Sequence, residues 1–300
     1  MREEYLLVDT SCLFMTYAYL PRPLGVDNGL NGSLIFLKAM QNRYPSLRII
    51  LVLDDKINEG KILNEDYKGQ RENKSHLYKN FDDFIVLSSK CWNVQHIVKG
   101  EGLEADKTIA VIANELVVNN PVLIYSKDND FWQLAGKVGV TNKYLGKDEG
   151  FKIITKDDVM KKYGVEPDRL IFYRMLKGDV SDNLKPPVAR VPSKKIIEIA
   201  NSIDLDRVFE DKGLTKEYLV EVLDKYEDKK LSAKYLEAID SIMLNYNIMD
   251  LYYCLMNNVD ELESKVKVIK NNATDKVVMN LLEKYNIKKL NAERIYGRHR

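Results

Sequence analysis

LIYSKDNDFWQL, residues 123–134, couples a short apolar run to two aspartates, Asp128 and Asp130. The run begins at Val122 and ends at Tyr125, and its short length with β-branched and aromatic residues favours a buried strand over a helix. In parallel sheets, ligands bind beyond the carboxyl ends of the strands. This stretch therefore indicates a strand whose end carries acidic side chains into a site.

Two earlier stretches of the chain repeat the pattern. Residues 5–8 are apolar and precede Asp9, and residues 49–53 are apolar and precede Asp54. Helical patterns separate these strands, because apolar residues recur every three or four positions between Ser33 and Tyr44 and between Glu104 and Val118. Strands that alternate with helices predict an α/β fold, with a central, mostly parallel sheet flanked by helices.

From about residue 155 the pattern becomes helical. Thr155 and Asp158 have the spacing of a capping box, Gly164 is placed to end that helix, and Pro167 is placed to begin the next. Strand signals mostly disappear beyond this point.

Two further segments, 215–226 and 232–257, read as amphipathic helices, and the Met and Tyr stripe of the second favours core packing. We therefore predict an α/β core over residues 1–182, including a polar insert over 56–90, and a helical subdomain over 183–300.

Composition excludes several classes of protein. Lys and Arg (46) almost balance Asp and Glu (45), so bulk charge does not indicate a polyanionic partner. The three cysteines are far apart and suggest neither a disulfide framework nor a zinc site. The N-terminal apolar stretch is too short for a signal peptide and no segment is long enough to span a bilayer. We expect a soluble, cytoplasmic protein without a membrane partner.

Acidic residues cluster at predicted strand ends and in nearby motifs. Taken singly, each would be a solvated surface group, but together they would repel one another and lose solvation, a penalty that divalent cations remove. Hard oxygen ligands favour Mg²⁺ or Mn²⁺, and two such ions can activate water and stabilise the leaving oxygen of a phosphodiester. The candidate acids are Asp9, Asp54, Asp55, Glu104, Asp106, Asp128, Asp130, Asp179 and Asp182.

At this point the motifs resemble those of the 5′-to-3′ exonuclease and flap-endonuclease family, and within it the small phage enzymes, including the phage ribonuclease H type. Their joint order is more specific than any single motif. The matching pieces are LLVDTS from 6, LVLDDK at 51–56, YKGQR at 67–71, GLEADKTIAVIA at 102–113, LIYSKDNDFWQL at 123–134 and LKGDVSDN at 176–183.

The resemblance implies a PIN-like 5′ nuclease core with two Mg²⁺ or Mn²⁺ ions. It implies that the second ion is served by Asp130, Asp179 and Asp182, some of them through water. Asp55 competes with Asp54 for one position. The first metal site would then comprise Asp9, Asp54, Glu104, Asp106 and Asp128.

In the family, the insert at 56–90 forms an arch through which a single strand passes. Lys68 and Arg71 are three residues apart, so on a helix they would share a face and could contact one phosphate as the bond breaks. A solvated helix face is the alternative for this pair. Tyr67 and Tyr78 are candidates for base stacking, although packing against the sheet is the better default.

The chain departs from the family in two places. Lys107 stands where many members have a second acid after Glu-Ala-Asp, and we expect metal binding to survive this change. After Asn183, where a glycine-rich turn usually holds duplex phosphates by backbone amides, the chain reads LKPPVARVPSKKIIEIA. We expect duplex contact there through four side chains, namely Lys185, Arg190, Lys194 and Lys195.

The resemblance implies a nuclease that cuts near 5′ ends of flap, nicked or RNA-primed duplexes in replication and repair. A replication protein such as a single-strand-binding protein is a candidate partner, a monomer is expected, and the compartment is the host cytoplasm if the chain is phage-encoded. One alternative is a nucleic-acid-binding scaffold that lost catalysis. Another is a Mg²⁺-dependent phosphatase or phosphotransferase on a parallel sheet.

Overall fold

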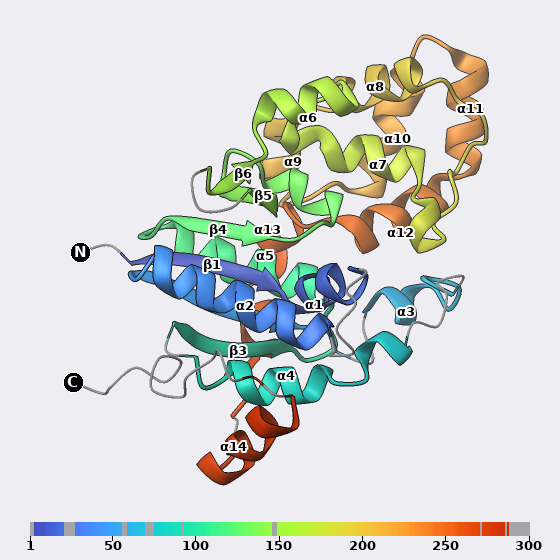
Figure 1. Cartoon of the computed structure of the whole chain (residues 1–300). Helices are drawn as coiled ribbons and strands as arrows, with labels where there is room; N and C mark the ends of the chain where they lie inside the picture. The colour runs from blue at the N-terminus through green and yellow to red at the C-terminus, as the bar shows by residue number, and fades with distance from the viewer. Residues whose placement is uncertain are drawn as a thin grey trace.

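The structure is a computed structural model of the 300-residue chain (Figure 1). It describes residues 3–20, 28–55, 59–69, 75–91, 93–145, 149–270, 272–285 and 287. Within these ranges, no helix combines the length and the apolar character required to cross a membrane.

One sheet, seven-stranded over the described residues, organises the molecule in the order β6-β5-β4-β1-β2-β3-β7. The pairs β1/β2, β1/β4, β2/β3 and β4/β5 are parallel, whereas the outer pairs β5/β6 and β3/β7 are antiparallel. The predicted mostly parallel sheet is therefore confirmed. The strands are β1 (Glu4–Asp9), β2 (Leu47–Leu53), β3 (Val94–Gly100), β4 (Val122–Tyr125), β5 (Gly139–Tyr144), β6 (Phe151–Ile153) and β7 (Val266–Val268).

Helices cover both faces of the sheet (Figure 1). Leu6 and Val8 of β1 belong to the core formed with the helices of one face, whereas Leu7 belongs to the larger core on the other face. Burial on both faces explains why the central strands read as continuous apolar runs. The helices of the α/β half are α1 (Thr10–Ala18), α2 (Asn28–Arg43), α3 (Glu59–Leu63), α4 (Phe81–Ser88) and α5 (Ala105–Val117), with 3₁₀ turns η1 (Ser75–Tyr78) and η2 (Asn129–Leu134).

The helical half begins as the sequence predicts. Thr155 and Asp158 form a reciprocal capping box before α6, and Gly164 ends that helix in the left-handed conformation with φ 76°. Pro167 opens the 3₁₀ turn η3 that leads into α7. The elements here are α6 (Lys156–Tyr163), η3 (Pro167–Arg169), α7 (Leu170–Lys177), η4 (Val180–Asp182), α8 (Ser193–Ser202), α9 (Leu205–Glu210) and α10 (Lys216–Lys225).

The prediction of one helix over 232–257 is wrong. The segment is divided among α11 (Lys229–Glu237), α12 (Ile239–Met249) and α13 (Cys254–Lys265). The Asp250 side chain accepts hydrogen bonds from the backbone N–H groups of Tyr252 and Tyr253, both at 2.9 Å, which ends α12. Core packing of the Tyr and Met stripe is confirmed, since Tyr235, Tyr246, Met249 and Tyr253 are buried.

The last part of the chain returns to the α/β half. β7 pairs with β3 at one edge of the sheet, and α14 (Asp275–Lys284) packs against α4. Tyr285 Oη donates a 2.5 Å hydrogen bond to Asp83 of α4. Residues 183–300 therefore contribute to both halves of the molecule, and the division at residue 182 stays a prediction.

Candidate metal centre

The carboxyl ends of the central strands open onto a cavity of about 280 Å³. Asp9 ends β1 and caps α1, accepting a 2.9 Å hydrogen bond from the Cys12 N–H. Asp54 follows β2 directly, and Asp128 follows β4 and caps η2. Five predicted acids line this one cavity, namely Asp9, Asp54, Glu104, Asp106 and Asp128.

The structure separates Asp54 from Asp55. Asp54 lies in the cavity wall, where it accepts hydrogen bonds from Ser11 Oγ at 2.9 Å and from the N–H of Ala105 at 3.0 Å. Asp55 instead pairs with Lys99 Nζ at 3.3 Å and accepts from the N–H of Gly102 at 2.9 Å. Asp54 is therefore the acid that faces the other cavity carboxylates.

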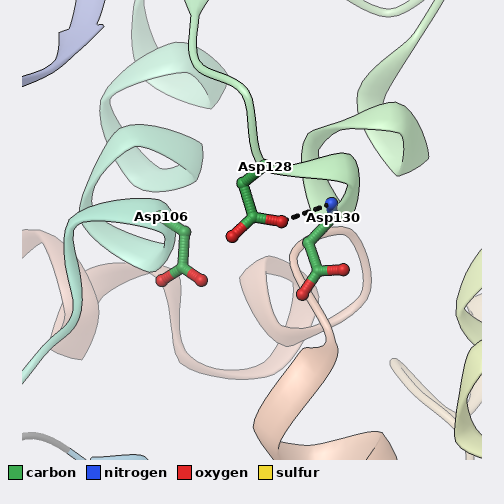
Figure 2. Close-up of side chains that lie close together, drawn as sticks. All are labelled: Asp106, Asp128 and Asp130. Carbon is green, nitrogen blue, oxygen red and sulfur yellow. Dashed lines mark hydrogen bonds between the residues drawn. The ribbon is translucent and has the colours of Figure 1, made fainter. Parts of the chain in front are cut away.

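Asp106, Asp128 and Asp130 lie close enough together to share a metal ion (Figure 2), since one carboxylate oxygen of each lies within 4.8 Å of those of the other two. The N–H of Asp130 donates to Asp128 Oδ1 at 2.9 Å, which holds the Asp128 carboxylate against the start of η2 (Figure 2). Three converging carboxylates offer the hard oxygen donors that Mg²⁺ and Mn²⁺ prefer, so this donor set fits a divalent cation.

Burial and mutual repulsion disfavour the charged forms of these acids. Burial, followed by the charge of Glu104, raises the pKa of Asp106 to about 8. Burial, followed by the charge of Asp54, raises the pKa of Asp9 to about 7. Burial also raises the pKa of Asp130 well above its ordinary value. The raised pKa values of Asp9 and Asp106 are as expected of acids in a site that binds cations.

Arg174 of α7 is a cation beside the cluster that the sequence analysis missed. Its guanidinium forms ion pairs with Asp130 and, at 2.5 Å, with Asp179. Burial alone would raise the pKa of Asp179, but the hydrogen bond from Ser181 and the charge of Arg174 lower it. The signal was a single arginine inside the apolar helix LIFYRMLK, where a charge needs a buried partner.

Tyr67 and Lys68 connect the base of the predicted arch to the acids. Tyr67 is buried, and its hydroxyl lies 2.9 Å from Glu104 Oε2 and 3.3 Å from Asp182 Oδ2. Lys68 Nζ lies 2.6 Å from Glu104 Oε1 and 4.0 Å from Asp182 Oδ2. These contacts bring Asp182 to the wall of the site next to Glu104.

Lys68 is not helical, so the helix face considered for Lys68 and Arg71 does not form at Lys68. Lys68 lies in a turn after α3 with φ 57°, because its N–H bonds the carbonyl of Asp182 at 2.9 Å. Arg71 lies outside the described residues. Tyr67 is buried, as expected if it packs in the protein, and its ring has no face open for stacking on a base. Tyr78 packs against Phe14 and Phe81.

The other predicted basic residues lie on the connection from α7 to α8 and on the start of α8, outside the cavity. Lys185, Arg190 and Lys194 are exposed, and Arg190 adopts φ 60°, a left-handed conformation that favours glycine. Lys195 Nζ lies 3.7 Å from Asp228 and 3.9 Å from Glu198.

Lys107 points away from the acids. Its Nζ donates to the carbonyl of Asn247 in the last turn of α12 at 3.0 Å. Lys107 therefore does not replace a ligand in the cluster.

The family model for the N-terminal, resolvase-like domain of 5′-3′ exonucleases matches residues 4–164. The chain belongs to the 5′-3′ exonuclease family. A 5′-3′ exonuclease of Mycoplasmopsis pulmonis is 29% identical over 181 residues, which cover 59% of this chain and 58% of that relative. One of Aquifex aeolicus is 26% identical over 275 residues, covering 89% of this chain and 88% of the relative.

Solved structures of other proteins have the same fold. A bacteriophage T5 flap endonuclease, in complex with DNA and metal ions, superposes with a TM-score of 0.63 and 15% identity, covering 95% of this chain and 100% of that one. At this identity the likeness supports the family fold alone. The chain spans about three fifths of the Mycoplasmopsis exonuclease's length, so activity is inferred below from the site itself.

Proposed function

We propose that this protein is a metal-dependent 5′ nuclease that hydrolyses phosphodiester bonds near the 5′ ends of flap, nicked or RNA-primed duplexes. The observation that carries the proposal is the convergence of Asp9, Asp54, Glu104, Asp106 and Asp128 on one cavity from three strand ends and the start of α5. A binding protein gains no stability from such a cluster of like charges.

We propose that the acid cluster binds two ions, one at each end. The first ion would be held by the five cavity acids, and the second by Asp130, Asp179 and Asp182, in part through water. Bound Mg²⁺ or Mn²⁺ would activate water and neutralise the scissile phosphate. Lys68 is within reach of the same acids, so its ammonium is placed to contact a phosphate held at the centre. Arg71 is proposed to act with it.

The duplex side of the substrate is proposed to lie against the start of α8. The exposed cations Lys185, Arg190 and Lys194 provide the contacts, with Lys195 beside them. The helical segment from residue 183 would thus serve duplex binding, while β7 and α14 complete the nuclease core. We further propose that the protein is a monomer and works with replication proteins, such as a single-strand-binding protein.

The test uses 5′-labelled flap, nicked and RNA-primed duplexes with Mg²⁺ or EDTA, comparing the wild-type chain with Asp128→Asn. We expect Mg²⁺-dependent products from the wild-type protein and a loss of at least about 100-fold in the variant. Asp260→Asn, an exposed position on α13, serves as the matched control. Substrate binding without any Mg²⁺-dependent product would favour the scaffold alternative.

A further inference from the structure

A groove of about 540 Å³ lies at the amino ends of β4 and β5. Both strands run parallel to β1, so their amino ends lie at the side of the sheet opposite the metal cavity, which the carboxyl ends form (Figure 1). A ligand in this groove would therefore leave the metal cavity open. We call it the amino-end groove, and its lining comprises residues 117, 121, 122, 136–139 and 153–156.

The apolar lining of the amino-end groove is aliphatic. Val138 and Ile154 are buried, whereas Ile153 at the end of β6 is 43% exposed and Pro121 is also exposed. Val118, one residue after a lining position, is 76% exposed. Buried and exposed aliphatic side chains thus share one surface, which matches the aliphatic side chains of a peptide. Nucleic acid bases bind mainly by stacking on aromatic rings, and the lining includes no aromatic residue over the described part of the chain.

Two lysines line the groove, whereas no acid does so among the described residues. Lys137 Nζ has neutral partners, namely the amide oxygen of Asn114 at 2.9 Å and the ring of Tyr252, whose centroid lies 5.0 Å away. Burial lowers the pKa of Lys137, as expected of an ammonium group that loses water without gaining a carboxylate. Within the described ranges, no carboxylate forms an ion pair with Lys137 or Lys156. The groove is therefore a positively charged surface.

The side chain of Lys156 packs on the backbone of Gly136. Gly136 has φ 88°, and a Cβ atom at this position would lie 2.5 Å from Cε of Lys156. The absence of that atom lets the lysine lie along the groove wall. Asp157 and Asp158 follow in the chain but do not line the groove, and the Asp158 carboxylate accepts the N–H of Thr155 at 2.9 Å.

We propose that the amino-end groove docks an acidic peptide segment of a partner protein, with aliphatic side chains against Ile153 and Pro121 and carboxylates at Lys137 and Lys156. Charge complementarity decides the occupant, since the described lining offers two cations and no anion. The aliphatic surface favours a peptide over a nucleic acid. Because the groove and the metal cavity lie at opposite ends of the strands, a partner bound here leaves the metal centre accessible to substrate.

The experiment screens the full-length chain against an array of synthetic peptides of about twelve residues, in which aliphatic residues are combined with acidic, basic or uncharged ones. We expect acidic peptides to bind the wild-type protein best. Fluorescence anisotropy then gives the Kd of the best binder for each variant. This Kd should rise about tenfold in Lys156→Glu, which reverses a charge, and about fivefold in Ile153→Ser, which removes apolar contact.

The controls make the same changes at exposed positions on α14, which packs against α4. Lys276→Glu and Val277→Ser should bind the peptide as the wild-type protein does. An array without binders, equal binding of basic or uncharged peptides, or a Kd in Lys156→Glu equal to that in Lys276→Glu would each overturn the proposal. A dimer in sedimentation that Ile153→Ser dissociates would also overturn it, because the occupant would then be a second copy of this chain.

Two further measurements separate this inference from the proposed nuclease function. Thermal unfolding shows that each variant is folded, and flap cleavage with Mg²⁺ should be the same in Lys156→Glu, Ile153→Ser and the wild-type protein. Reduced cleavage in a folded groove variant would mean that the groove contacts the substrate, which would refute docking of a peptide. Absence of cleavage by the wild-type protein would refute the nuclease proposal and leave the peptide result standing.

Discussion

Replacing Asp106 by Asn is expected to stabilise the metal-free protein while weakening metal binding. Burial and the charge of Glu104 raise the pKa of Asp106 from 3.8 to about 8. Between these two values the folded chain holds a proton that the unfolded chain has released, so stability falls as the pH rises through this window. Asn is neutral at every pH and removes this linkage.

The magnitude follows from the same two values. In the unfolded chain the carboxyl has its ordinary pKa of 3.8, and pH 7 lies 3.2 units above that value. At about 1.36 kcal/mol per unit, the largest stabilisation by Asn is about 4 kcal/mol. Asp106 keeps some contact with water and its neighbouring acids can move apart, so we expect about 1 to 3 kcal/mol.

The assay is urea unfolding in EDTA at pH 5 and pH 8, with Asp260→Asn as the control. Asp106→Asn should gain more over wild type at pH 8 than at pH 5, and the control should match wild type at both. Added Mg²⁺ should stabilise the wild-type protein and do much less for Asp106→Asn. Equal stability of wild type and Asp106→Asn at pH 8 would refute the reasoning that this acid is destabilising without metal.

Three further substitutions test other parts of the site. Arg174→Met should lower the unfolding free energy in EDTA by about 3 to 5 kcal/mol, because two acids lose their buried partner; urea unfolding that shows no loss would contradict this. Asp54→Asn should reduce Mg²⁺-dependent cleavage at least about 100-fold while Asp55→Asn keeps most of it, and equal losses in a flap-cleavage assay would argue against the assignment of Asp54. Tyr67→Phe should raise the Kd for Mn²⁺, measured by calorimetry, about tenfold. Tyr226→Phe is the control, because the Tyr226 hydroxyl bonds the surface acid Glu198. Equal Kd values for the two variants would count against a positioning role for Tyr67.

The central strands were predictable because each is buried on both faces and has an acid at its carboxyl end or shortly after it. β1, β2 and β4 therefore appear in the sequence as short apolar runs, and the order β4-β1-β2 places their ends side by side. The strands toward one edge of the sheet, β3 and β7, were not predictable in this way. β3 has the sequence VQHIVKG with two exposed polar positions, and the three-residue β7 is defined only by its pairing with β3.

The residues of the candidate site also differ in whether the sequence could predict them. Acids that follow strands or open helices were found because their positions are local features of the sequence. Arg174 was missed because its role depends on tertiary contacts with Asp130 and Asp179, and a lone arginine in an apolar helix does not identify these partners. The conformation of Lys68 depends likewise on a long-range contact, since its N–H donates a backbone hydrogen bond to the carbonyl of Asp182.

The acids of the site differ in how the protein itself neutralises them. Arg174 pairs with Asp130 and Asp179, and Lys68 pairs with Glu104. Among the described residues, no lysine or arginine forms an ion pair with the remaining cavity acids Asp9, Asp54, Asp106 and Asp128. A cation that binds among these four gains attraction without displacing a protein group, whereas a cation at Asp130 must compete with Arg174. We therefore expect the two ions of the proposed function to bind with unequal affinity, the tighter one at the end of the cluster formed by Asp9 and Asp54.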